Sequence, residues 1–250
     1  MSDGTTLTYR RVEELDGRVA AALLQWGISL ADTKHRIGIR TSEWVNGGPA
    51  LEAAVGASAI TQDELGHARS LYAIFKDFPG VPDGVGAEND LQARDMYHCP
   101  RLLNEPWPSW LDVITVNVLL DRAAMIAVTA AHNSAYSPLK GRTAKILQEE
   151  AFHRIFGDSW LAKLARMGDE MHGRLQTSLN HFGATAVTWF GPDDDPQTAL
   201  LVDNSILHKT PTQMRQEWWA EIMPLLEKHN LTLSHAEPDW SGWHPAYREA

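Results

Sequence analysis

Apolar residues recur along most of this chain every three or four positions, the spacing that places them on one face of an α-helix. Stretches that alternate apolar and polar residues, as strands do, are scarce. The sequence therefore predicts an all-α protein. The expected helices cover residues 8–44 (open to breaks near Gly17 and Gly27), 50–78, 110–135, 142–167, 169–190 and 212–230.

Turn residues group the long helices into two hairpins. Gly and Pro at 46–49 mark one short turn, and Ser137, Pro138 and Gly141 mark the other. Residues 79–108, with several Gly, Pro and Asp, form a longer crossover between the hairpins. This arrangement is typical of a four-helix bundle core, here with extra C-terminal helices. We expect one helical domain over 1–250, whose tail from about 231 fits no regular element.

Composition and charge narrow the class of protein. Of 250 residues, 22 are basic and 32 acidic, a net charge of −10 that disfavours binding to nucleic-acid phosphates. Cys99 is the only cysteine, which excludes an internal disulfide framework and a CxxC zinc site. Residues 1–4 lack the basic start of a signal peptide, and Asp121 and Arg122 interrupt the longest apolar stretch. We expect a cytoplasmic protein without a membrane span.

Two acid-x-x-His pairs fall near the middle of predicted helices. Glu64 and His67 form one pair, and Glu150 and His153 form the other. A spacing of three places both side chains on one helix face, about one turn apart. Each pair interrupts an apolar stripe, and burying a carboxylate with an imidazole is costly unless the two are paired or bind a metal. The alternative is an ordinary exposed helix face.

The two hairpins repeat with an offset that suggests further ligands. Glu64 and Glu150 are 86 positions apart, as are His67 and His153, and 86 positions before Asp121 lies His35. Asp32 lies about one helical turn before His35. Carboxylates and histidines projecting inward from four helices are typical of di-iron carboxylate proteins. The predicted metal ligands are therefore Asp32 or His35, Glu64, His67, Asp121, Glu150 and His153.

Two neighbouring acids are candidates to support the histidines. A histidine that binds a metal usually donates its other N–H to an acceptor, and Asp63 and Glu149 lie directly beside the predicted ligands. Adjacent helical residues point away from one another, so these acids could serve other helices. For Asp121, the alternative to a metal ligand is a salt bridge, for example to Arg122.

Three segments resemble the bacterial phenylacetyl-CoA epoxidase (ring-1,2-monooxygenase) family, namely residues 60–67, 119–124 and 148–153. The resemblance covers roughly 20–190. It implies a ferritin-like fold whose catalytic subunit uses two irons to activate oxygen and epoxidise the aromatic ring of a CoA thioester. Residues 38–44 are more similar to the family's structural subunit, which pairs with the catalytic one and has lost ligands.

The chain departs from the family pattern at one position. The family's catalytic subunit has a Glu about 30 residues before the equivalent of Glu64, where this chain has Lys34. A one-residue shift brings His35 into that place, and Asp32 is the nearest carboxylate. We expect either a complete site with an unusual first ligand or one weakly held iron.

The resemblance supports three functions. The first is a di-iron monooxygenase subunit that oxidises an aromatic or acyl-CoA substrate, and the second is a non-catalytic scaffold subunit. The third is a ferritin-type iron-binding oxidase. The sequence lacks dinucleotide and phosphate-loop motifs, so electrons would come from a separate reductase. The expected partner chain is a homologous ferritin-like subunit or a second copy.

Overall fold

The computed structural model describes residues 8–85, 94 and 96–250, and helices dominate these parts. The central ones are α1 (Gly17–Ser42), α2 (Leu51–Phe75), α3 (Trp110–Val116), α4 (Arg122–Ala130) and α5 (Ser137–Leu164). The outer ones are α6 (Asp169–Thr188), α7 (Pro196–Asp203) and α8 (Pro211–Glu227). Within the described residues, extended pairing is limited to two isolated bridges, so the all-α prediction is confirmed.

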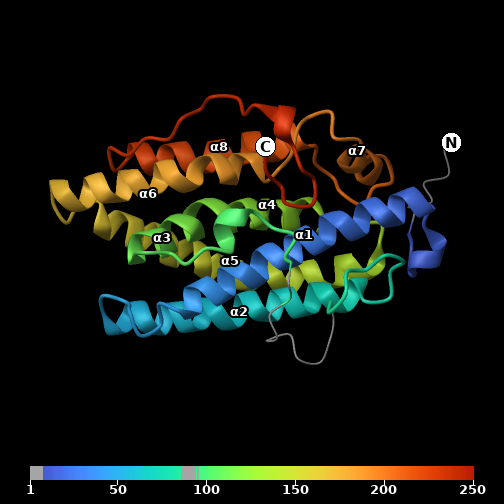
Figure 1. Ribbon diagram of the computed structural model, residues 1–250, viewed down its shortest axis with the longest axis horizontal. Coiled ribbons are helices and arrows are strands. Elements are labelled where there is room, and N and C mark those ends of the chain that lie inside the picture. Colours follow the sequence, from blue (N-terminus) through green and yellow to red (C-terminus); the bar gives the residue numbers. More distant parts are fainter. Residues whose placement is uncertain (1–7, 86–93, 95) are drawn as a thin grey trace.

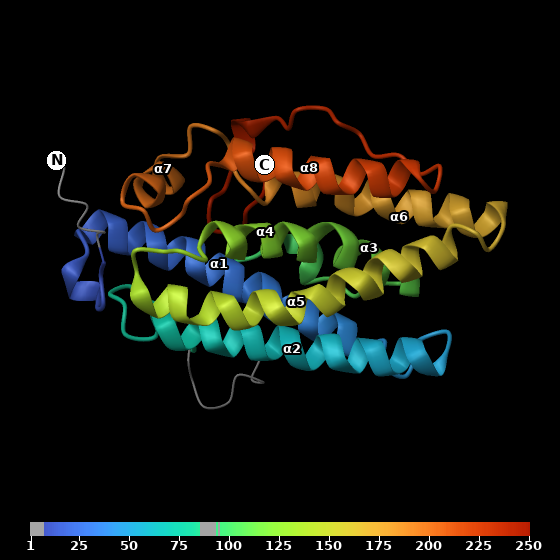
Figure 2. The ribbon, with the colours of Figure 1, turned by 180° about the vertical axis from the view of Figure 1, so that it is seen from behind.

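The bundle core consists of α1, α2, α5 and the rod that α3 and α4 form together (Figure 1). Helix α1 packs along α2, α2 packs on α5, and α5 packs on α4. Helices α3 and α4 are one continuous rod, joined by a π-helical segment, Asn117–Asp121. Helices α6 and α8 cover the side of this rod that faces away from α2 (Figures 1 and 2). The rod that carries Asp121 is therefore enclosed by other helices.

Helix α1 continues through Gly27, where the sequence left a break open. A Cβ atom at position 27 would overlap the ring of Phe75 on α2, so the glycine allows the two helices to approach closely. The other break left open by the sequence, near Gly17, is confirmed, because α1 begins at Gly17 and not at residue 8. Asp16 caps the helix by accepting the Arg18 backbone N–H at 2.9 Å, and Val12–Glu14 form a separate 3₁₀ turn.

The second hairpin differs from the prediction at its turn. Helix α5 begins at Ser137, so Pro138 lies in its first turn rather than in a loop. Proline is well tolerated there because the first N–H groups of a helix lack partners within the helix. Helix α7, which was not predicted from the sequence, begins at Pro196, and Asp195 caps it.

The tail from 231 is mostly extended, with a 3₁₀ turn at Trp240–Gly242. It returns to the bundle, where the Ser29 hydroxyl of α1 donates to the carbonyl oxygen of Ala246 at 2.9 Å. Part of the predicted crossover, and the N-terminal residues 1–4, lie outside the described residues.

The stretch Trp110–Ala130 is long and apolar enough to cross a membrane by length and composition alone. In this structure, however, 89% of its apolar window is buried against the other helices. Such burial is what the central rod of a packed helical bundle shows, and the length test by itself does not separate the two cases.

Candidate metal centre

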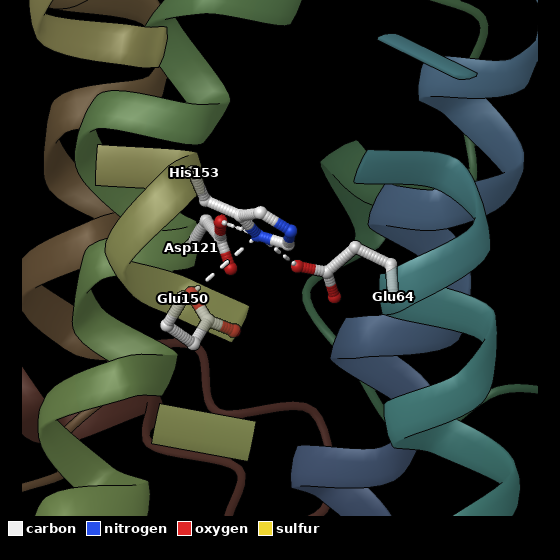
Figure 3. Close-up of side chains that lie close together, drawn as sticks. All are labelled: Glu64, Asp121, Glu150 and His153. Atoms are coloured by element: carbon white, nitrogen blue, oxygen red, sulfur yellow. Dashed lines mark hydrogen bonds and ion pairs between the residues drawn. The ribbon is translucent and has the colours of Figure 1, made fainter. Parts of the chain in front are cut away.

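Four of the predicted ligands meet near the middle of the bundle. Glu64 projects from α2, Asp121 from the π-helical segment, and Glu150 and His153 from α5 (Figure 3). All four residues are buried, and one ligand atom of each lies within 4.8 Å of the others. This group could hold a metal ion, and it combines the two hairpins as the 86-residue offset predicts.

The π-helical segment sets the position of Asp121. A π turn inserts an extra residue into a helix and is frequent at functional sites. The carbonyl oxygen of Leu119, within this segment, accepts the indole N–H of Trp218 on α8 at 2.9 Å. Asn117 donates its side-chain amide to Asp121 Oδ2 at 3.2 Å. Asp121 was predicted from the sequence, whereas the π turn and the part played by α8 were missed.

Lys34 is the residue that α1 contributes to this centre. Its side chain is fully buried, and its ammonium donates to Glu64 Oε1 at 3.1 Å and also to Asp121 and Glu150. Burial acts to lower the pKa of Lys34, but the charges of the three carboxylates raise it well above its ordinary value. The side chain is therefore an ammonium ion surrounded by acids. The sequence pointed to this position because it lies 30 residues before Glu64, where the resembling family has a Glu.

His153 is the second cation of the cluster. Its Nδ1 lies 3.1 Å from Asp121 Oδ2 and 3.2 Å from Glu64 Oε1. Burial acts to lower the pKa of His153, but the contacts with Asp121 and Glu64 raise it to about 11. In this arrangement the imidazole is protonated, and both ring nitrogens carry hydrogen.

The carboxylates respond to the same surroundings in different directions. Burial and the charge of Asp121 raise the pKa of Glu64 to about 7, although Lys34 acts against this. Burial also acts to raise the pKa of Asp121, but Lys34 and His153 outweigh it and hold the pKa well below its ordinary range. Two buried cations therefore face three acids, one of which readily keeps a proton, and the cluster is close to neutral by itself.

Each acid beside a predicted ligand contacts the histidine of the opposite helix. His67 on α2 lies with Nε2 2.9 Å from Glu149 Oε2 on α5. In the mirrored arrangement, His153 on α5 lies with Nε2 3.5 Å from Asp63 Oδ2 on α2. The expectation that Asp63 and Glu149 serve other helices is thus met. His67, also a predicted ligand, is not a member of the four-residue group, although its Nδ1 lies 3.5 Å from Glu150 Oε1.

Asp32 and His35 lie away from the four-residue group. Asp32 is buried and accepts the Tyr72 hydroxyl at 2.5 Å, the His98 backbone N–H at 2.6 Å and the Arg94 guanidinium. The ring of His35 stacks on Tyr97, with ring centres 5.1 Å apart. Successive helical residues are rotated by about 100°, so α1 turns Lys34 to the centre and these two side chains elsewhere. Asp32 instead anchors the crossover to α1 and α2.

The donor chemistry of the group suits a divalent metal, but the arrangement does not suit a pair of them. Three carboxylates and an imidazole are common ligands of iron, manganese and zinc, and buried Glu64 Oε2 has no hydrogen-bond partner. An ammonium donates hydrogen bonds and accepts none, so Lys34 cannot be a ligand. It holds the same carboxylate oxygens that a metal would need. With Lys34 in place, the side chains do not fit a two-metal centre.

A ferritin-like helical bundle with a buried acid–histidine centre is therefore the class of protein that the fold and the site define. Residues 11–250 match the family described as phenylacetic acid catabolic protein, and the chain belongs to this family.

Two curated relatives come from Escherichia coli (strain K12), and both are named as subunits of 1,2-phenylacetyl-CoA epoxidase. The chain is 28% identical to one of these subunits over 198 residues, which cover 78% of this chain and 62% of the relative. It is 23% identical to the other over 214 residues, or 84% of each chain. The first match therefore spans less than two thirds of the relative's length. The resemblance seen in the sequence is confirmed.

Proposed function

We propose that this chain is a structural subunit of an oxygenase complex of the phenylacetyl-CoA epoxidase kind, and that it works without a metal of its own. The single observation that carries the proposal is the Lys34 ammonium, which contacts Glu64, Asp121 and Glu150 in the buried centre. The relatives that support it are named as two different subunits of one epoxidase. A homologous ferritin-like chain would carry the metal, and a separate reductase would supply the electrons.

In this proposal the buried centre holds the bundle together. Lys34 links α1 to α2, α5 and the π-helical segment through one ammonium. His153 links α5 to α2 through Glu64 and to the π-helical segment through Asp121. A buried ion pair adds little net stability over an apolar core, but removing one partner commonly costs about 3–5 kcal/mol. The chain would thus keep its shape whether or not iron is available. The substrate of the whole complex would be an aromatic CoA thioester.

Metal content of the purified chain tests the proposal. The chain is incubated with ferrous iron without oxygen, passed through a desalting column and analysed for iron. We expect less than about 0.1 iron per chain, because the ammonium excludes the metal. The chain is then mixed with a metal-bearing homologue and a reductase, and oxidation of phenylacetyl-CoA should require both ferritin-like chains. About two irons per chain, or turnover by this chain and a reductase alone, would contradict the proposal.

A di-iron oxygenase is the second candidate. The buried oxygen Glu64 Oε2, which has no hydrogen-bond partner, favours it, since a metal would satisfy this oxygen. Glu64, Asp121, Glu150 and His153, with His67 beside them, would hold the irons if Lys34 moved out of the centre. Two bound irons would supply oxygen-activating chemistry, and Mössbauer spectra of the iron-loaded chain would detect them. Oxygen uptake with ferrous iron alone would point instead to a ferritin-type oxidase.

A further inference from the structure

The carboxylates and the imidazole of the centre are gathered by contacts that do not involve Lys34. Asp121 is placed by the π-helical segment, which Trp218 of α8 holds through the Leu119 carbonyl oxygen. The Asn117 amide also donates to Asp121. Outside the group, the His67 contact with Glu149 ties α2 to α5. Because none of these contacts includes Lys34, we expect them to persist when its side chain is shortened or made neutral.

Lys34 supplies charge at the point where the ligand atoms converge. Its ammonium contacts one oxygen each of Glu64, Asp121 and Glu150, and its side chain is fully buried. A divalent ion at the same point would contact the same oxygens and would be repelled by the ammonium at close range. The ammonium and the metal therefore compete for one position. The residue at position 34 of α1 determines which of them occupies it.

Resting on the metal-free centre proposed above, we infer that Lys34 is a stand-in cation in a latent divalent-metal site. Glu64, Asp121, Glu150 and His153 form the ligand set, and Lys34 alone keeps a divalent transition metal out. When the ammonium is removed, three buried carboxylates lose their main counter-charge and a divalent ion replaces it. His153 Nδ1, which lies 3.1 Å from Asp121 Oδ2 and 3.2 Å from Glu64 Oε1, would complete the ligand set.

Substitution of Lys34 tests the inference with the metal ion alone. Lys34→Met keeps the length and apolar stem of the side chain without its charge, and Co²⁺ is a suitable probe because its visible spectrum reports coordination by protein ligands. Equilibrium dialysis of Co²⁺ against the wild-type chain should give less than about 0.1 ion per chain. Lys34→Met should bind about one ion, with an affinity at least about 100-fold higher and new visible absorption bands.

A matched control separates the proposed ligands from adventitious surface binding. The double variant Lys34→Met/Glu64→Gln keeps the neutral residue at 34 but removes one ligand, and it should lose the tight Co²⁺ binding and the absorption bands. The melting temperature should rise with Co²⁺ for Lys34→Met only, because binding to the folded state alone stabilises it. Equal binding by the single and double variants would overturn the inference.

The outcomes also separate this inference from the proposed function. If the wild-type chain binds the ion tightly, Lys34 excludes nothing and both fail. If the wild-type chain and a folded Lys34→Met variant both stay free of metal, only the latent site is disproved. Should Lys34→Met fold solely in the presence of Co²⁺, the ion has replaced the ammonium, which supports the inference. If Lys34→Met and Lys34→Gln both stay unfolded with and without the ion, the inference is wrong.

Discussion

The indole N–H of Trp218 donates to the carbonyl oxygen of Leu119 across 2.9 Å, and so joins α8 to the π-helical segment that ends at Asp121. Trp218 is fully buried. Replacing it with Phe removes the donor and leaves a buried carbonyl oxygen without this partner. We expect Trp218→Phe to lower the free energy of unfolding by roughly 1–3 kcal/mol, measured by urea denaturation.

The adjacent Trp219 provides the control for this substitution. Its ring is half-buried and packs edge-on against Trp218. Trp219→Phe should therefore change the free energy of unfolding by less than Trp218→Phe does. Equal losses in the two variants would show that packing of the rings, rather than the hydrogen bond to Leu119, holds the π turn.

The protonated His153 makes stability depend on pH. Its pKa in the folded chain, about 11, is above its ordinary value of 6.5. The stabilising contribution is therefore fully present below about pH 6.5 and is lost as the pH rises through about 11. The difference in free energy of unfolding between the wild-type chain and His153→Gln should shrink as the pH rises from 6.5 to 10. A constant difference over this range would mean that His153 is neutral in the folded chain.

The sequence predicted the paired helices and most of the centre for a simple physical reason. Glu64, Glu150 and His153 interrupt apolar stripes in helices, and Asp121 is a lone acid in an apolar stretch. A polar group at such a position must find a partner, so the pattern alone places it inside the bundle. Helical periodicity within each stripe was enough, and the structure brings these four residues together.

The contribution of α1 could not be predicted in the same way. Asp32, Lys34 and His35 are all buried, so burial does not tell which of them faces the centre. The choice depends on how α1 is rotated, and close packing of Gly27 against Phe75 on α2 contributes to that rotation. Such a contact joins residues far apart in the sequence. A single sequence carries no periodic signal for it.

Removal of the Lys34 charge should destabilise the chain when metals are absent. Lys34→Met leaves Glu64, Asp121 and Glu150 buried beside one another with His153 as their remaining cation. We expect a loss of about 3–5 kcal/mol in the free energy of unfolding, measured in the presence of a chelator. Lys140→Met, at an exposed position of α5, should change it by less than about 0.5 kcal/mol. Similar losses in both variants would argue against a buried ammonium.

Asp32 should matter for stability rather than for metal binding. It accepts hydrogen bonds from Tyr72 and from the His98 backbone and pairs with Arg94, which together tie the crossover to the bundle. Asp32→Asn should lower the free energy of unfolding by about 2–4 kcal/mol, because Arg94 loses its buried partner. When combined with Lys34→Met, it should leave the Co²⁺ affinity unchanged. A marked drop in that affinity would restore Asp32 as a ligand.

A pair of glycine substitutions tests the close contact between α1 and α2. A Cβ atom at Gly27 would overlap the Phe75 ring, whereas one at Gly66, on the exposed side of α2, would meet no neighbour within 4 Å. Gly66→Ala should raise the free energy of unfolding by roughly 0.5–1 kcal/mol, because alanine favours the helix. Gly27→Ala gains the same helix preference, yet forcing a methyl group into a packed contact typically costs about 1–3 kcal/mol. Thermal denaturation should therefore shift the two melting temperatures in opposite directions, and a rise in both would show that α1 and α2 are less closely packed at Gly27.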